Sequence, residues 1–116
     1  MVDFKTFRYF YFGARQYRTL DLYIAACSQN TDTGAAPDRA WIKILAAIYT
    51  ISNDGIVGMM QVSGLKLKTL ADMYAVPYPT AQRWKFGKNT PPEYTMLLMG
   101  YAVVNALEQQ ASQNAS

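Results

Sequence analysis

The stretch from Leu65 to Tyr94 constrains the fold of this chain more than any other part of the sequence. Its apolar spacing predicts two short helices, at residues 66–74 and 79–86. Between them stands Ala75-Val76-Pro77, and proline cannot continue a helix because it lacks an N–H and clashes with the preceding turn. Two short helices joined by so tight a turn predict a helix-turn-helix.

Small and apolar residues stand where such a pair of helices must pack. Ala71 lets the second helix cross the first closely, and Val76 is expected as a buried plug under the turn. Ala81 and Trp84 lie three positions apart and supply the face that packs back on the first helix. We expect Trp84 to be a core residue. The complementary polar face of the second helix holds Thr80, Gln82, Arg83 and Lys85.

Three further helices are predicted in the rest of residues 37–108. Pro37 and Asp38 favour a helix start, and its core-facing positions are Trp41, Ile44, Leu45, Ile48 and Ile51. That helix should end at Asn53-Asp54-Gly55, before a shorter helix at residues 56–62. The last helix should begin at Pro91, Pro92 and Glu93 and run through Leu97, Leu98, Tyr101, Val104 and Leu107. Residues 109–116 are expected to be a frayed polar tail.

The N-terminal 36 residues form a separate predicted unit. Six aromatic residues stand within residues 4–12, and such residues favour a pleated, half-buried surface. We therefore expect a short β-hairpin that turns near Gly13-Ala14, the alternative being one irregular helix from residue 4. Thr19 then caps a helix that runs to about Ser28. The expected fold is mainly α, with about five to six helices and a short N-terminal β-hairpin.

Composition excludes several classes of function. The 116 residues contain no His and one Cys, Cys27, which excludes an intramolecular disulfide, a thiolate metal cluster and every nucleophile–histidine pair. The eight acids are scattered, and no glycine-rich phosphate loop follows a strand. We expect no enzyme activity, no metal and no cofactor. No apolar run approaches the roughly 20 residues that cross a bilayer, and no signal peptide is apparent, so we expect a cytoplasmic protein with no membrane partner.

Positive charge is concentrated in two segments. The net charge is +3, but residues 66–88 hold five bases and one acid, and residues 5–18 hold four bases and no acid. The more strongly charged segment coincides with the predicted helix-turn-helix, which is the pattern of a nucleic-acid contact. The N-terminal aromatic residues, interleaved with Lys5 and Arg8, could stack on single-stranded bases, or form a hairpin core or a dimer seam.

The same segment resembles a known superfamily. One part of the resemblance is Leu70-Ala71-x-x-Tyr74-x-Val76-Pro77; the other is Thr80-x-Gln82-x-Trp84-x-x-Gly87-Lys88-x-x-Pro91-Pro92-Glu93-Tyr94. These residues resemble the Cro/repressor-type helix-turn-helix superfamily, and within it small regulators of bacteria, phages and plasmids. The resemblance covers residues 55–104. It implies a second helix that enters the major groove of duplex DNA.

The resemblance assigns roles to particular side chains. Thr80, Gln82, Arg83 and Lys85 would face DNA, with Gln82 reading adenine and Arg83 reading guanine. Thr80 and the amides of residues 78–80 would hold a phosphate, and Tyr78 would either pack or contact phosphate. The side chains that would neutralise phosphates without reading sequence are those of Lys66, Lys68 and Lys88.

Two features depart from the pattern. Pro79 stands where such proteins often carry a residue that touches DNA, and the positive charge is modest. Tight binding would therefore need a homodimer, with a surface from residues 1–36 or from Leu97, Tyr101 and Val104. The first expectation is a repressor in a bacterial host cell. One alternative is a phage anti-CRISPR inhibitor that binds a Cas nuclease or another protein and that can also repress its own promoter. The other alternative is an antitoxin.

Overall fold

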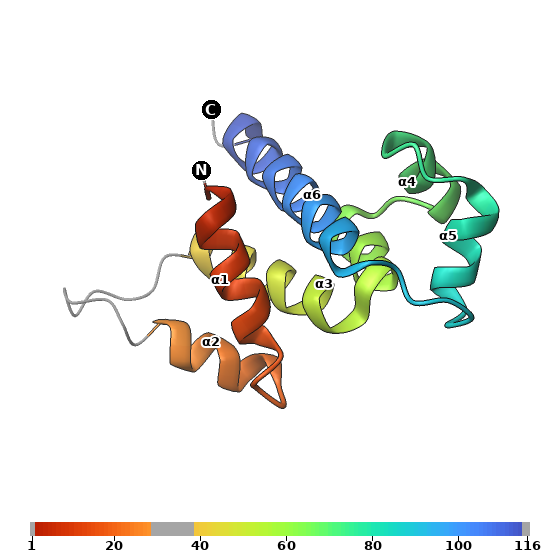
Figure 1. Ribbon diagram of the computed structural model, residues 1–116. Helices are drawn as coiled ribbons and strands as arrows, with labels where there is room; N and C mark the ends of the chain where they lie inside the picture. Colours follow the sequence, from red (N-terminus) through yellow and green to blue (C-terminus); the bar gives the residue numbers. More distant parts are fainter. Residues whose placement is uncertain (1, 29–38, 115–116) are drawn as a thin grey trace.

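The computed structural model describes residues 2–28 and 39–114, which form six α-helices and contain no β-strand (Figure 1). The mainly α part of the prediction is therefore confirmed. The helices are α1 (Phe4–Ala14), α2 (Leu20–Ser28), α3 (Arg39–Ser63), α4 (Leu67–Met73), α5 (Tyr78–Lys85) and α6 (Glu93–Asn114). The predicted helix start at Pro37 and Asp38 lies outside the described residues.

Helix α1 replaces the expected N-terminal hairpin, and that prediction is wrong. Asp3 caps the helix by accepting a hydrogen bond from the amide of Thr6 at 2.7 Å. Phe7, Tyr11 and Ala14 are buried, and their spacing of four and three residues places them on one helical face. Burial of that face against the rest of the chain outweighs the β preference of aromatic residues, which depends on context. The alternative of a helix from residue 4 gives the observed element.

Helix α2 has the predicted boundaries and cap. The amide of Leu22 donates to Oγ1 of Thr19 at 3.2 Å, so Thr19 is the N-cap residue. Leu20, Ile24 and Cys27 share the inner face of this helix, as expected. They pack against a small cluster formed by Ala14, Tyr23 and Leu45.

Helix α3 is bent sharply at the predicted turn. Gly55 has φ 61° and ψ −132°, a conformation that is costly for any residue with a side chain. The chain beyond it runs as a second helical segment, so the two predicted helices are present and meet at Gly55. Gly58 in the second segment touches the first, because a Cβ there would overlap the carbonyl of Thr50. The bend therefore requires a glycine at each of two positions.

The core forms where α1 and α6 pack on α3 (Figure 1). The residues predicted for the core-facing side of α3 are buried or half-buried. Ser52 of α3 donates its hydroxyl to the carbonyl of Tyr11 at 2.6 Å, which satisfies an acceptor in the last turn of α1. Arg15 forms an ion pair with Glu93 at 2.7 Å and so joins the end of α1 to the start of α6.

Helix α6 is longer than expected. It continues to Asn114, through residues that were expected to form a frayed polar tail. Its N-terminal half is closely packed, since a Cβ at Gly100 would lie 3.0 Å from Cγ2 of Ile51 and 3.3 Å from Cζ of Phe7. Helices α4 and α5 lie at one end of the molecule and α2 at the other (Figure 1).

Candidate nucleic-acid interface

The turn between α4 and α5 is a Schellman motif built on a residue other than glycine. The amide of Val76 donates to the carbonyl of Ala71 at 2.9 Å, and the amide of Ala75 donates to the carbonyl of Asp72 at 3.4 Å. These two bonds require a left-handed residue at position 75, and Ala75 has φ 56°. The turn thus holds the two helices at a fixed angle.

The residues predicted to pack α4 against α5 are buried or half-buried. Ala71 and Ala81 are fully buried, which allows α4 and α5 to approach closely. Val76 and Trp84 are half-buried and pack against the main core. Trp84, expected as a core residue, is thus half-buried at the edge of the core, and two short helices joined by a tight turn lie at residues 67–85.

The outward face of α5 has the predicted centre but includes two residues that were not predicted for it. Gln82 and Arg83 are exposed at its middle, as expected. At 3.6 residues per turn, Pro79 and Phe86 share this face with them, whereas Lys85 and Thr80 fall at its two edges. Thr80 is half-buried and Lys85 is exposed.

Phe86 is the residue that sequence reasoning missed. Its side chain is 66% exposed, and Nζ of Lys85 lies 5.4 Å from its ring centroid. The spacing of Pro79, Gln82, Arg83 and Phe86, at i, i+3, i+4 and i+7, could have revealed it. An apolar side chain beside Gln82 and Arg83 adds a means of contact with a thymine methyl group or with a protein surface.

Two of the lysines predicted for phosphate contact lie at the two ends of α5. Nζ of Lys68 in α4 lies 5.6 Å from the ring centroid of half-buried Tyr78, so these two residues are neighbours at the start of α5. The amide of Lys88 donates to the carbonyl of Arg83 at 2.9 Å, which places Lys88 at the other end of the helix. Lys66 is exposed at the N-cap position of α4.

The N-terminus of α5 has open amide donors. Pro77 occupies the N-cap position and no side chain caps the helix. Pro79 is in the first turn and lacks an N–H, whereas the carbonyl of Pro77 accepts from the amide of Ala81 at 3.0 Å. The amides of Tyr78 and Thr80 are the remaining donors in the first turn, where the helix dipole favours an anion.

Electrostatics around α5 are positive. Among residues 2–28 and 39–114, no ion pair involves the five basic residues of the 66–88 segment. Burial raises the pKa of the Tyr74 hydroxyl at the end of α4, so this residue adds no negative charge at neutral pH. The surface keeps the net charge of +4 that the sequence gives to residues 66–88, from five bases and one acid.

The dimer surface predicted on α6 is wrong. Leu97 and Val104 are buried inside the chain, and Tyr101 donates its hydroxyl to the carbonyl of Val2 at 3.1 Å. Because this face of α6 packs on α1 and α3, it is closed to a second copy. Two large apolar residues of α6, Tyr94 and Leu98, are exposed on another face of the helix.

Comparisons with protein families, with characterised proteins and with solved structures gave no match for this chain. Within the described residues, no helix is both long and apolar enough to cross a membrane. The same residues contain no group of three or more acidic or cysteine side chains able to hold a metal ion.

Proposed function

We propose that this chain is a sequence-specific DNA-binding protein, which inserts α5 into the major groove and represses transcription as a homodimer. One observation carries the proposal. Gln82 and Arg83 are exposed at the middle of the outward face of α5, on a helix that a buried turn fixes against α4. Helix-turn-helix proteins read bases from this position, and the resemblance to Cro/repressor-type regulators supports the same role.

Each side chain has a distinct task in this proposal. Gln82 can pair with adenine through one donor and one acceptor, and Arg83 can donate two hydrogen bonds to guanine. Lys68 and Lys88 flank the helix and neutralise phosphates, while the amides of Tyr78 and Thr80 bind one phosphate directly. Thr80 and Lys85, at the edges of the outward face, contact the backbone rather than the bases.

The test is selection of duplexes from a random pool, followed by fluorescence anisotropy of the selected sequence. We expect Arg83→Ala to weaken binding by about 1–3 kcal/mol and to relax specificity at one position. Arg18→Ala is the matched control, since Arg18 is also exposed but precedes α2, outside the helix-turn-helix. Binding that is weak, unselective and equally affected by both substitutions would contradict the proposal.

The lysines are tested separately through salt. Each phosphate contact that is lost should reduce the slope of log K against log salt by about 0.9. Lys68→Ala and Lys88→Ala should therefore lower the slope without changing the preferred sequence. A change in preferred sequence would mean that these residues read bases.

The second copy would dock on the exposed face of α6 at Tyr94 and Leu98. The shallow groove beside them is lined by Tyr74, Val76 and Met99, and no lining residue is charged. A neutral patch suits contact between two identical, positively charged molecules. Leu98→Glu should give a monomer by sedimentation equilibrium. The matched control is Leu22→Glu, because Leu22 in α2 is 55% exposed and Leu98 is 56% exposed.

A second candidate function follows from Phe86. Together with Met73 and Tyr94, it places large exposed apolar side chains around the helix-turn-helix, and such side chains anchor protein interfaces. The partner would be a protein such as a Cas nuclease, as in an anti-CRISPR inhibitor. Phe86→Ala should abolish capture of a purified nuclease while Arg83→Ala leaves it intact. The opposite pattern would favour DNA.

A further inference from the structure

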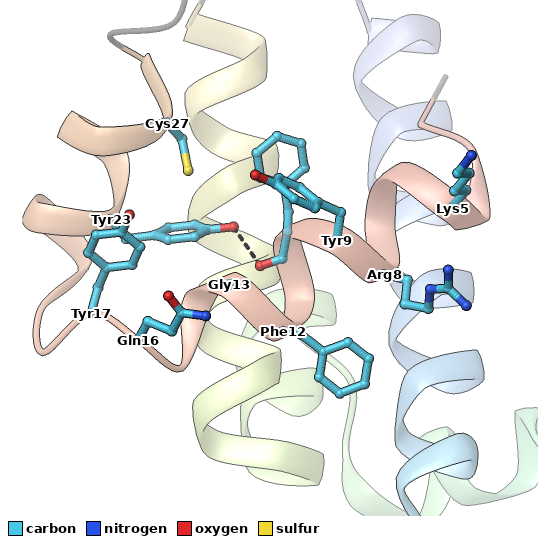
Figure 2. Close-up of a pocket in the computed structure, with 10 residues that line it drawn as sticks. Lys5, Arg8, Tyr9, Phe12, Gly13, Gln16, Tyr17, Tyr23 and Cys27 are labelled. Atoms are coloured by element: carbon cyan, nitrogen blue, oxygen red, sulfur yellow. Dashed lines mark hydrogen bonds between the residues drawn. The ribbon is translucent and has the colours of Figure 1, made fainter.

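A hollow lies between α1 and α2, away from the helix-turn-helix (Figure 2). Its volume is about 460 Å³, within the roughly 300–1,000 Å³ of small-molecule sites. Five aromatic side chains line it, namely Tyr9, Phe10, Phe12, Tyr17 and Tyr23. Tyr9 is 74% exposed, so a large aromatic ring is left in contact with water beside an open space.

The inner walls of this hollow are fixed in place. Tyr23 is buried, and its hydroxyl donates to the carbonyl of Phe10 at 2.9 Å (Figure 2). The ring of Tyr23 also packs edge-on against Tyr17, with centroids 5.7 Å apart. Phe10 is held between Tyr9 and Trp41, with centroids 5.2 Å and 5.3 Å away. A ligand that enters therefore has few inner side chains to order, which favours binding.

Positively charged and neutral polar side chains border the aromatic walls. Lys5, Arg8 and Gln16 are exposed and line the hollow, and no carboxylate of residues 2–28 or 39–114 does. In Figure 2, Lys5 and Arg8 lie on the other side of Tyr9 from Tyr23 and Cys27. Arg8 forms no ion pair with any residue of the described ranges. Burial raises the pKa of the Cys27 thiol, so Cys27 contributes no negative charge near pH 7.

The aromatic walls and the positive border together disfavour several classes of ligand. A cation would be attracted by the rings but repelled by Lys5 and Arg8. A neutral apolar molecule would leave the guanidinium of Arg8 without a partner, and an aliphatic acid would make little use of the ring faces. A flat ring that carries a negative group uses both parts of the site, since rings pair with rings and guanidinium pairs with carboxylate, sulfonate or phosphate.

We propose that the hollow between α1 and α2 binds a small planar aromatic anion, with its ring over Tyr9 and beside Tyr23 and its anionic group at Arg8 and Lys5. This site is independent of DNA binding by α5. Free aromatic acids and nucleotides share the required chemistry.

The experiment uses two fluorescent probes that differ in charge. Anilinonaphthalene sulfonate carries the anionic group, and phenylnaphthylamine lacks it. We expect the wild-type chain to bind the sulfonate more tightly than the neutral compound. Arg8→Gln should weaken sulfonate binding by about two- to fivefold, as for an exposed ion pair, and leave the neutral compound unchanged. Arg18→Gln, which alters an exposed arginine outside the lining, should change neither.

A second variant tests the location. Gly13 lines the hollow, and a Cβ there would meet no atom within 4 Å, so Gly13→Leu adds bulk at the wall of the hollow without a clash at Cβ. It should weaken binding of both probes, and an unchanged circular dichroism spectrum is the control for the fold. Equal binding of the two probes by wild type, or unchanged binding in both Arg8→Gln and Gly13→Leu, would overturn the proposal.

Competition distinguishes the sources of the anion. Displacement of the sulfonate by an indole carboxylate assigns the site to free aromatic acids, and displacement by adenosine monophosphate assigns it to nucleotides. Displacement by neither refutes the proposed ligand class. Tight binding of single-stranded oligothymidine, lost in Arg8→Gln while the sulfonate still binds, would instead assign this surface to a nucleic-acid strand.

Discussion

Ala75 holds the left-handed backbone that ends α4, with φ 56°. In that conformation, steric strain at the Cβ of an L-residue lowers the free energy of unfolding by roughly 1–2 kcal/mol. Glycine removes this strain. It also gives the unfolded chain more freedom, which lowers the free energy of unfolding by about 0.4–1 kcal/mol. Ala75→Gly should therefore raise the free energy of unfolding by up to about 1.6 kcal/mol, measured by urea titration. Gly87→Ala is the reverse change at φ 74° and should lower it. Two changes of the same sign would contradict this account.

Asp3 gives a prediction about pH. The backbone hydrogen bond from Thr6 to its carboxylate lowers the pKa of Asp3. A carboxylate with a lowered folded pKa stabilises the fold fully above its unfolded pKa of about 3.9, and this stabilisation is lost as pH falls through the folded value. Asp3→Ala should therefore lower the free energy of unfolding at neutral pH, with a smaller effect in strong acid. Asp3→Asn keeps the acceptor and is the control. An effect of Asp3→Ala that is the same at both pH values would count against the cap.

At the scale of the helix, α1 shows the limit of residue preferences. The aromatic content of residues 4–12 favoured a strand, yet the spacing of Phe7, Tyr11 and Ala14 was already helical, and Asp3 stood at a cap position. Whether residues 4–12 form a strand or a helix depends on the surface against which they pack. That surface belongs to α3 and α6, and it exists only in the folded chain. By contrast, Thr19 marks the start of α2 and Pro77 marks the break between α4 and α5, and the predicted bounds of these three helices agree with the structure within two residues.

The bend of α3 yields a prediction at the same scale. A Cβ at Gly58 would overlap the backbone carbonyl of Thr50, which no side-chain rotation can relieve. Gly58→Ala should lower the free energy of unfolding by about 1–3 kcal/mol or more, as overpacking does. Gly13→Ala in α1 meets no atom within 4 Å and should raise it by about 0.5–1 kcal/mol, because alanine favours a helix. Equal effects of the two substitutions would rule out close packing as the cause.

Viewed as a whole, the molecule explains which site residues could be predicted. Gln82 and Arg83 belong to one short motif, and a local pattern was sufficient to place them on an exposed face. The hollow between α1 and α2 joins residues from two helices, and no spacing in the sequence could bring Tyr9 beside Tyr23. The dimer prediction on α6 failed for a related reason, since Leu97 and Val104 are apolar at the correct period but face α3 and α1.

Whether the N-terminal unit and the helix-turn-helix unfold together is a property of the whole chain. Phe7 of α1 is fully buried and belongs to the same core as Leu70, Ala81 and Val104. Its ring centroid lies 5.5 Å from that of Tyr101 in α6. Loss of packing at Phe7 should therefore be felt throughout the core, rather than in α1 and α2 alone.

The two tryptophans allow this to be measured. Trp41 packs on Phe10 beside α1, whereas Trp84 lies in α5 at the other end of the molecule. Phe7→Leu should lower the free energy of unfolding by about 1–3 kcal/mol. If the core is one cooperative unit, the urea midpoint should shift equally in single-tryptophan backgrounds that retain Trp41 or Trp84. A midpoint that shifts when Trp41 is the reporter but not when Trp84 is the reporter would contradict this. It would mean that the N-terminal helices unfold separately from α4 and α5, and that the shared core of α1, α3 and α6 couples them weakly.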